Sequence, residues 1–161
     1  VYTWDQIEGQ KSSSTLNMYG VFDLSGGVWE RTAGYVANGY SQLKKYGSSL
    51  TDSGKRTTST KYVTVYPYDK TETSTDIDTK SRANYKVNKY IFGDAIREIS
   101  TSGTGTTSWK RDYSYFPALN SPFSARGGNL WSGSNAGVFC FDRANGGSYC
   151  YVGFRPILIV L

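Results

Sequence analysis

Two cysteines, Cys140 and Cys150, are the side chains of this 161-residue chain that could act as nucleophiles, metal ligands or a redox pair. The chain has no histidine, so the commonest general base and metal ligand is absent. The spacing of the two cysteines does not match a zinc site. They could form a disulfide if their loops meet, or they could stay as free thiols. The chemistry available therefore depends on the segment that contains both residues.

Both cysteines lie in a C-terminal segment, residues 126–155, in which two kinds of position alternate. Glycines, aromatic residues and arginines form the clusters Arg126-Gly127-Gly128, Gly137-Val138-Phe139 and Gly153-Phe154-Arg155. Small, polar or aromatic residues without a packing period lie between these clusters. This arrangement predicts a rigid frame that holds a surface built to be varied.

The composition predicts a single domain, residues 1–161, that is long enough to bury one core. Leu and Ile are sparse, whereas Tyr, Phe, Trp and Gly are frequent, which favours short strands and tight turns over a helical bundle. The net charge is +5, but the basic residues are scattered, so a nucleic-acid partner is not expected. No apolar run reaches the length of a membrane span, so no membrane span is expected in this chain.

Weaker local signals lie between the two ends of the chain. Residues 40–46 could form a short helix, and residues 61–66 alternate and are β-branched as in a strand. Residues 47–80 are otherwise rich in Ser, Thr, Asp and Lys and are predicted to be a surface insertion. The chain begins at Val1 without an initiator Met, so we expect it to be the C-terminal part of a longer protein.

Three separated motifs follow one another in a specific order. They are Gly20-Val21-Phe22-Asp23-Leu24-Ser25-Gly26-Gly27-Val28-Trp29-Glu30, Arg126-Gly127-Gly128 and Gly153-Phe154-Arg155. In this order they resemble the formylglycine-generating-enzyme (sulfatase-modifying factor) branch of the C-type lectin fold. The resemblance implies an α+β, C-type-lectin-like fold with short, twisted, mostly antiparallel strands, two helices and long ordered loops.

The resemblance does not imply the enzyme, because function depends on the site and not on the fold. The reactive cysteines of the catalytic members fall at offsets that correspond here to Ser132 and Gly137, and neither residue can supply a thiolate. Gly27 stands where the family usually has Asn, so a metal site that uses that side chain is not expected. We therefore expect no catalytic residues, no metal and no cofactor.

The framed pattern from Arg126 to Arg155 resembles more closely the variable region of diversity-generating-retroelement target proteins. In those proteins a reverse transcriptase copies a template unfaithfully at adenines, and the copy replaces the 3′ end of the gene. Randomised Asn codons never produce Lys, Glu, Gln, Met or Trp. Residues 126–161 contain no Lys, Glu, Gln or Met, although every Lys and Glu of the chain lies before them. Trp131 is the exception and is assigned to the fixed frame.

The resemblance separates the terminal segment into varied and fixed positions. The predicted variable, ligand-binding residues are Asn129, Leu130, Ser132, Cys140, Asp142, Arg143, Ala144, Ser148, Tyr149, Cys150 and Tyr151. The predicted frame residues are Trp29, Arg126, Gly127, Gly128, Trp131, Phe139, Gly153, Phe154 and Arg155. We expect Arg126 and Arg155 to be partly buried and bonded to backbone carbonyls or to a carboxylate such as Asp23 or Glu30. Free thiols are expected at both cysteines, because a programmed disulfide would belong to the frame.

These features predict a hypervariable ligand-binding domain, a receptor or adhesin displayed on a cell or virion surface. Its partner is expected to be a protein or a glycan on another surface, bound by residues that change without disturbing the scaffold. One alternative is a formylglycine-generating-type oxidase. Another is a calcium-dependent sugar-binding lectin, although the Glu-Pro-Asn and Gln-Pro-Asp sugar signatures are absent.

Overall fold

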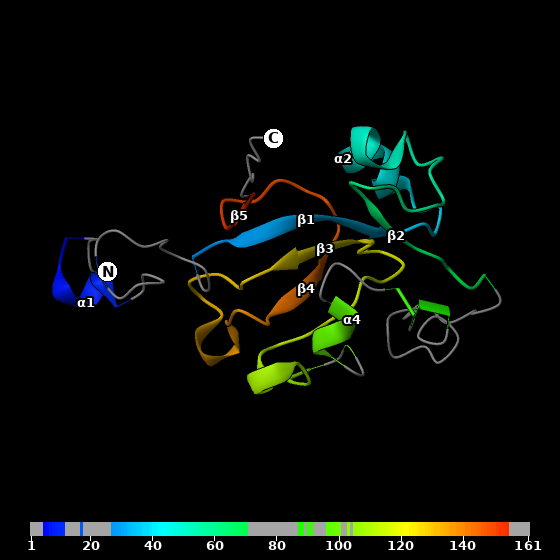
Figure 1. Cartoon of the computed structure of the whole chain (residues 1–161). Helices are drawn as coiled ribbons and strands as arrows, with labels where there is room; N and C mark the ends of the chain where they lie inside the picture. The colour runs from blue at the N-terminus through cyan, green and yellow to red at the C-terminus, as the bar shows by residue number, and fades with distance from the viewer. Residues whose placement is uncertain are drawn as a thin grey trace.

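The computed structural model describes residues 5–11, 17, 27–70, 87–88, 90–91, 96–100, 103 and 105–154. These residues form an α+β fold around one five-stranded sheet, which confirms the expected class (Figure 1). The strands are β1 (Trp29–Val36), β2 (Thr64–Tyr66), β3 (Phe123–Arg126), β4 (Phe141–Ala144) and β5 (Val152–Gly153). The α-helices are α1 (Ile7–Gln10), α2 (Ser41–Thr51) and α4 (Ile96–Ile99), and 3-10 turns cover Trp109–Arg111 and Gly133–Asn135.

The sheet is organised around β1, its longest strand, and runs in the order β2-β1-β3-β4. β3 is antiparallel to both β1 and β4, whereas β2 and β5 are parallel to β1. β5 pairs with Trp29 and Glu30 and β2 pairs with Gly34 to Val36, so the two short strands share the edge of β1 that faces away from β3. The expectation of mostly antiparallel strands is therefore wrong, and the sheet is mixed.

Long connections explain the parallel pairings. A tight hairpin joins antiparallel neighbours, whereas a parallel neighbour needs a crossover. The chain from β1 to β2 passes through α2, and the chain from β4 to β5 passes back over the sheet as the loop 145–151. In the described residues α2 is the one helix longer than four residues, where the resemblance implied two helices.

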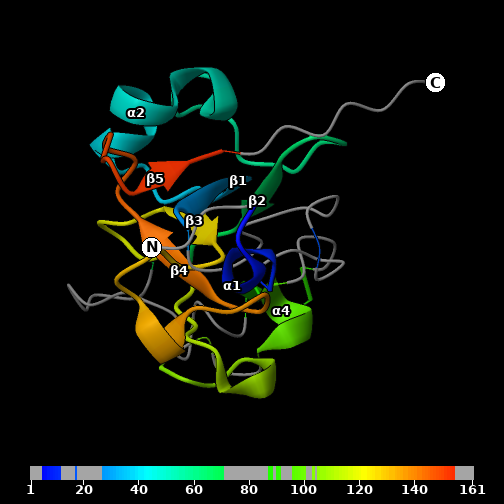
Figure 2. The ribbon, with the colours of Figure 1, turned by 90° about the vertical axis from the view of Figure 1, so that its left-hand side faces the viewer.

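Two hydrophobic clusters lie on opposite faces of the sheet. Tyr35, Leu43, Val65 and Phe123 pack between the sheet and α2. Strand alternation turns Phe141 to the other face, where it packs with Ile96, Ile99 and Phe116. Figure 2 shows α2 on one side of the sheet and α4 on the other. The sheet is therefore covered on both faces, which fixes the strands that carry the C-terminal segment.

The predicted surface insertion over residues 47–80 is wrong for residues 47–66. Gly47 to Thr51 complete α2, which the sequence had predicted only for residues 40–46. The predicted strand over residues 61–66 is confirmed for Thr64–Tyr66, and Val65 and Tyr66 are buried. The polar composition of residues 47–66 suggested a surface segment, but its polar residues include the buried Thr51. The Thr51 hydroxyl donates to the carbonyl oxygens of Leu43 and Gly47 at 2.9 Å. Residues 71–80 lie outside the described residues.

Candidate functional site

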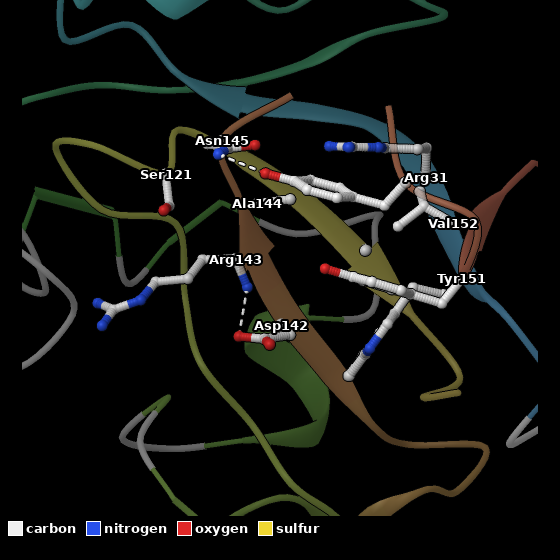
Figure 3. A pocket seen from close by; sticks show the side chains of 11 residues that line it. Arg31, Ser121, Asp142, Arg143, Ala144, Asn145, Tyr151 and Val152 are labelled. Carbon is white, nitrogen blue, oxygen red and sulfur yellow. Dashed lines mark hydrogen bonds between the residues drawn. The ribbon is translucent and has the colours of Figure 1, made fainter. Parts of the chain in front are cut away.

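A pocket of about 250 Å³ opens on the face of the sheet that also carries α2 (Figure 3). Its lining joins β1, β3, β4 and the loop that leads into β5. Five of the residues that line it come from the predicted variable set: Asp142, Arg143, Ala144, Tyr149 and Tyr151. The structure thus brings one strand and one loop of the terminal segment together around a single cavity.

The register of the sheet forms the floor of the pocket. Arg31 on β1 is paired with Ala125 on β3, and Ala125 is paired with Asp142 on β4. Residues paired directly across antiparallel strands project from the same face. Arg31, Ala125 and Asp142 therefore form one row, in which the small Ala125 leaves space between two charged side chains. Figure 3 shows Arg31 and Asp142 on different sides of the cavity.

Aromatic rings form one wall of the pocket. Tyr149 and Tyr151 stack with ring centroids 5.2 Å apart and an interplanar angle of 13°. The exposed Trp131 meets Tyr151 edge to face at 5.8 Å and 84°. Aromatic pairs of this kind supply a large and rigid contact surface at low entropic cost.

Hydrogen bonds hold the loop that carries this wall. Asn145 accepts the backbone N–H of Gly147 on Oδ1 at 2.8 Å, and its Nδ2 donates to the Tyr149 hydroxyl at 3.0 Å. Gly146 has φ +98°, a conformation that L side chains rarely adopt. Nη2 of Arg31 donates to the carbonyl oxygen of Gly147 at 2.7 Å, which ties the loop to β1. The wall is therefore positioned by its own loop and by one residue of the scaffold.

The electrostatics of the floor depend on burial. Burial lowers the pKa of Arg31, and the neighbouring Tyr149 opposes this shift. Burial raises the pKa of Asp142 to about 6, although the backbone N–H of Arg143 donates to Asp142 Oδ1 at 2.7 Å and stabilises the carboxylate. Arg143 alternates to the opposite face, where its guanidinium lies 5.0 Å from the ring centroid of Tyr115. The floor thus presents a cation and a carboxyl group in a partly desolvated setting.

The remaining predicted variable residues fall into two groups. Leu130, Ser148 and Cys150 are exposed, and the last two belong to the loop that carries Tyr149. Asn129 is only 8% exposed, so its assignment as a ligand contact is wrong. Its Oδ1 accepts the backbone N–H of Trp131 at 3.1 Å and the Ser132 hydroxyl at 3.0 Å. The half-buried Ser132 in turn accepts the backbone N–H of Asn129 on Oγ at 3.0 Å, so the pair fixes a turn.

The glycines of the predicted frame occupy positions where the backbone or its neighbours leave little room for a side chain. Gly127 and Gly128 have φ angles of +87° and +78°. A Cβ at Gly128 would lie 2.8 Å from Cβ of Ala136, and a Cβ at Gly153 would lie 3.2 Å from Cγ2 of Val28. A Cβ at Gly137 would collide with the carboxylate of Asp112. Side chains other than hydrogen are therefore strained or excluded at these positions.

The aromatic and arginine residues of the frame are more varied. Trp29 lines the pocket, and Phe139 packs against the cluster around Phe141. Trp131 and Phe154, which were assigned to the fixed frame, are 66% and 79% exposed. Trp131 extends the aromatic wall through Tyr151.

Of the two frame arginines, the structure describes Arg126. The β1–β3 register places the half-buried Arg126 opposite Glu30, one of the carboxylates predicted as its partner. Arg155 and Asp23 lie outside the described residues.

The two cysteines are free thiols in very different surroundings. Cys150 is exposed, whereas Cys140 is fully buried. Burial, reinforced by Asp142 and Asp112, raises the pKa of Cys140 to about 12. Cys140 therefore cannot contact a ligand, and its assignment to the variable surface is wrong. It lies one residue before β4, and its side chain is enclosed by the fold.

The burial of Cys140 predicts a difference in thiol reactivity. We expect iodoacetamide at pH 7.5 to alkylate Cys150 in the native chain at least about a hundredfold faster than Cys140, because the thiolate is the nucleophile. Peptide mapping by mass spectrometry after timed quenching checks this. Cys150→Ser is the matched control, since it should remove the fast reaction and leave only labelling that appears in denaturant. Comparable rates at the two residues would contradict the burial of Cys140.

The sequence did not predict Arg31 as a site residue, because it lies far along the chain from the C-terminal segment that contains the predicted variable positions. The available signal was strand alternation, since Trp29 and Arg31 project from the same face of β1 and both line the pocket.

In the part of the chain that the structure describes, no group of three or more His, Cys, Asp or Glu side chains is arranged to hold a metal ion. Within the same ranges, no helix has both the length and the apolar character needed to cross a bilayer. No protein-family model, curated protein or solved structure matches the chain.

Proposed function

We propose that this chain is a hypervariable ligand-binding domain, a receptor or adhesin diversified by a retroelement and displayed on a cell or virion surface. The observation that carries the proposal is the convergence of Asp142, Ala144, Tyr149 and Tyr151 on one pocket. The sequence pattern that groups these residues contains no information on which side chains share a face. The scaffold is taken to be C-type-lectin-like, of the formylglycine-generating-enzyme type.

The separation of fixed from varied positions supports the proposal. Gly127 and Gly128 hold backbone conformations that other residues adopt only with strain. The pocket residues Ala144, Tyr149 and Tyr151 are half-buried or exposed, and their side chains face a cavity. Substitutions at such positions change the shape and charge of the surface at little cost to the core. A protein that varies its pocket while keeping its fold needs this division.

The chemistry of the surface supports binding. Trp131, Tyr149 and Tyr151 form a continuous aromatic contact area, and the exposed Leu130 precedes Trp131. Aromatic residues of this kind are typical of binding surfaces, and Ser and Asn add adaptable hydrogen bonds. We take the domain to be non-catalytic, and its partner to be a macromolecule on another surface. No observation among the described residues favours the oxidase or the calcium-dependent lectin.

The retroelement part of the proposal is tested by sequencing the neighbourhood of the gene. We expect a reverse-transcriptase gene and a near-copy of the gene's 3′ end that differs from it at adenines. The codons for Asp142, Ala144, Tyr149 and Tyr151 should be among those that differ, whereas the codons for Gly127 and Gly128 should not. A neighbourhood without such a copy would remove the retroelement and leave the pocket to be explained otherwise.

The binding part is tested by a displayed library in which Asp142, Ala144, Tyr149 and Tyr151 are randomised on the otherwise unchanged chain. We expect most members to fold and selection against unrelated proteins to yield specific binders. A library of equal size at four exposed residues of α2, Ser41, Lys44, Lys45 and Ser48, is the matched control and should yield none. Equal yields from both libraries would contradict a dedicated binding surface.

A further inference from the structure

Arg31 has unused hydrogen-bonding capacity inside the pocket region. Its Nη2 donates to the carbonyl oxygen of Gly147, whereas Nη1 is buried without an acceptor in the part of the chain that the structure describes. Buried donors of a charged group are normally paired, because leaving one unpaired is costly. Because Arg31 also lines the pocket, a ligand acceptor that reaches Nη1 there would satisfy this nitrogen.

The charge of Arg31 is also uncompensated. No carboxylate of the described residues lies within ion-pair distance of its guanidinium, and burial lowers its pKa. Asp142 is two strands away across Ala125, so the two backbones are separated by about 10 Å. β3 lies between the two strands, and the cavity is lined by Arg31, Ala125 and Asp142, as Figure 3 shows for Arg31 and Asp142. An acidic group entering the cavity would meet a cation that has no carboxylate partner among the described residues.

Arg31 lies outside the part of the chain that is predicted to vary. Arg31 belongs to β1, whereas the residues that form the other side of the pocket belong to the predicted variable region, residues 126–155. Retroelement copying that is confined to the 3′ end of the gene leaves residue 31 unchanged. The pocket thus combines one constant cation with several interchangeable neighbours.

We propose that Arg31 is a constant anchor for a carboxylate presented by an Asp or Glu side chain of a protein partner. A guanidinium holds a carboxylate through charge-assisted hydrogen bonds in a planar geometry, and Arg31 lines the pocket with Nη1 buried and lacking an acceptor. The residues of the variable region then select among partners by the surroundings of that acidic side chain. This inference rests on the proposed function in taking the pocket as the binding site.

The aromatic wall favours a protein partner over an acidic sugar. A pyranose needs the open face of an aromatic ring to stack on. Tyr149 and Tyr151 turn one face of each ring toward the other, at an angle of 13°, and Tyr151 also meets Trp131. A cavity of about 250 Å³ with a cation at its floor accommodates a single acidic side chain and its neighbouring atoms.

The test is a titration of the whole chain, labelled with ¹⁵N-arginine and ¹⁵N backbone, by two capped amino acids. The probes are N-acetyl-glutamate amide and its neutral counterpart N-acetyl-glutamine amide, with glucuronate as the sugar acid. We expect the Arg31 Nε–Hε signal to shift saturably with the glutamate probe, which should bind at least about tenfold more tightly than the glutamine probe. Amides of Ala144 and Tyr151 should shift with it.

Variants separate an anchor from a merely structural arginine. Arg31→Gln should abolish the preference for the glutamate probe, and Arg31→Lys, which keeps the charge but not the fork of donors, should retain part of it. Because Arg31 also holds the carbonyl of Gly147, both variants also lose a contact that positions the loop. Ala144→Leu leaves Arg31 in place and narrows the pocket, so it should weaken binding of the glutamate probe on its own.

Three results would overturn the inference. The first is equal binding of the glutamate and glutamine probes, and the second is tighter binding of glucuronate than of the glutamate probe. The third is a set of shifts centred on Tyr46 and Leu50, which line a second cavity of about 240 Å³ that Arg31 also borders. If the titration fails but the pocket library yields binders, Arg31 is not an anchor and the proposed binding function is retained. A gene without a diversifying copy leaves the titration result unaffected.

Discussion

Gly128→Ala is expected to lower the free energy of unfolding by about 3 kcal/mol, the sum of left-handed backbone strain and overpacking. Gly128 has φ +78°, where an L side chain is strained. A Cβ there would lie 2.8 Å from Cβ and 3.0 Å from Cα of Ala136, and the Ala136 backbone can move little. Urea denaturation followed by tryptophan fluorescence measures the change, provided that the slope with urea is unchanged.

Gly133→Ala is the matched control for this prediction. Gly133 also has a positive φ, +54°, but no heavy atom lies within 4 Å of a Cβ built there. It should therefore lose only the backbone contribution, about 1 kcal/mol. The difference between the two variants isolates the packing contribution at the frame. Equal losses would show that Gly128 is retained for its dihedral angles alone.

The sequence predicted those features that depend on local patterns. Residues 40–46 and 61–66 were recognised because a helix and a strand impose their own periods, and both appear as α2 and β2. The glycine frame was recognised from its motifs, and within it Gly127 and Gly128 have positive φ angles, which favour glycine whatever lies around them. The grouping of Asp142, Ala144 and Tyr151 followed from framing and codon logic, and all three line the pocket.

The features that the sequence did not predict depend on contacts between distant segments. The parallel pairing of β1 with β5 joins Glu30 to Gly153, and no local signal marks such a pair. Cys140 is enclosed where it precedes β4, and Asn129 is buried in a turn that it forms with Ser132; the sequence pattern marked neither residue as buried. Arg31 became a site residue only when the register placed it in a row with Ala125 and Asp142.

Asp142→Asn is expected to make the protein more stable at pH 7 and to leave it nearly unchanged at pH 4. Burial raises the pKa of Asp142 from 3.8 to about 6 in the folded chain. Between these values the unfolded chain binds fewer protons than the folded chain, so the free energy of unfolding falls as pH rises from about 4 to about 6. At 1.36 kcal/mol per pKa unit the full loss is about 3 kcal/mol, which sets the order of magnitude of the gain in the neutral variant.

The decisive measurement is the difference between the wild-type and Asp142→Asn unfolding free energies at half-unit steps from pH 3.5 to pH 7.5. Other carboxyl groups contribute to both proteins, so the difference isolates Asp142, unless the substitution shifts its neighbours. Asp142→Ser is the companion variant, because it removes the charge without adding an amide, and its difference curve should have the same shape. Parallel curves for wild type and both variants would show that the carboxylate is not destabilised in the fold. A carboxylate that lowers stability at neutral pH is not explained by the stability of the scaffold. Its position in the pocket, across Ala125 from Arg31, therefore supports the proposed binding role of Asp142.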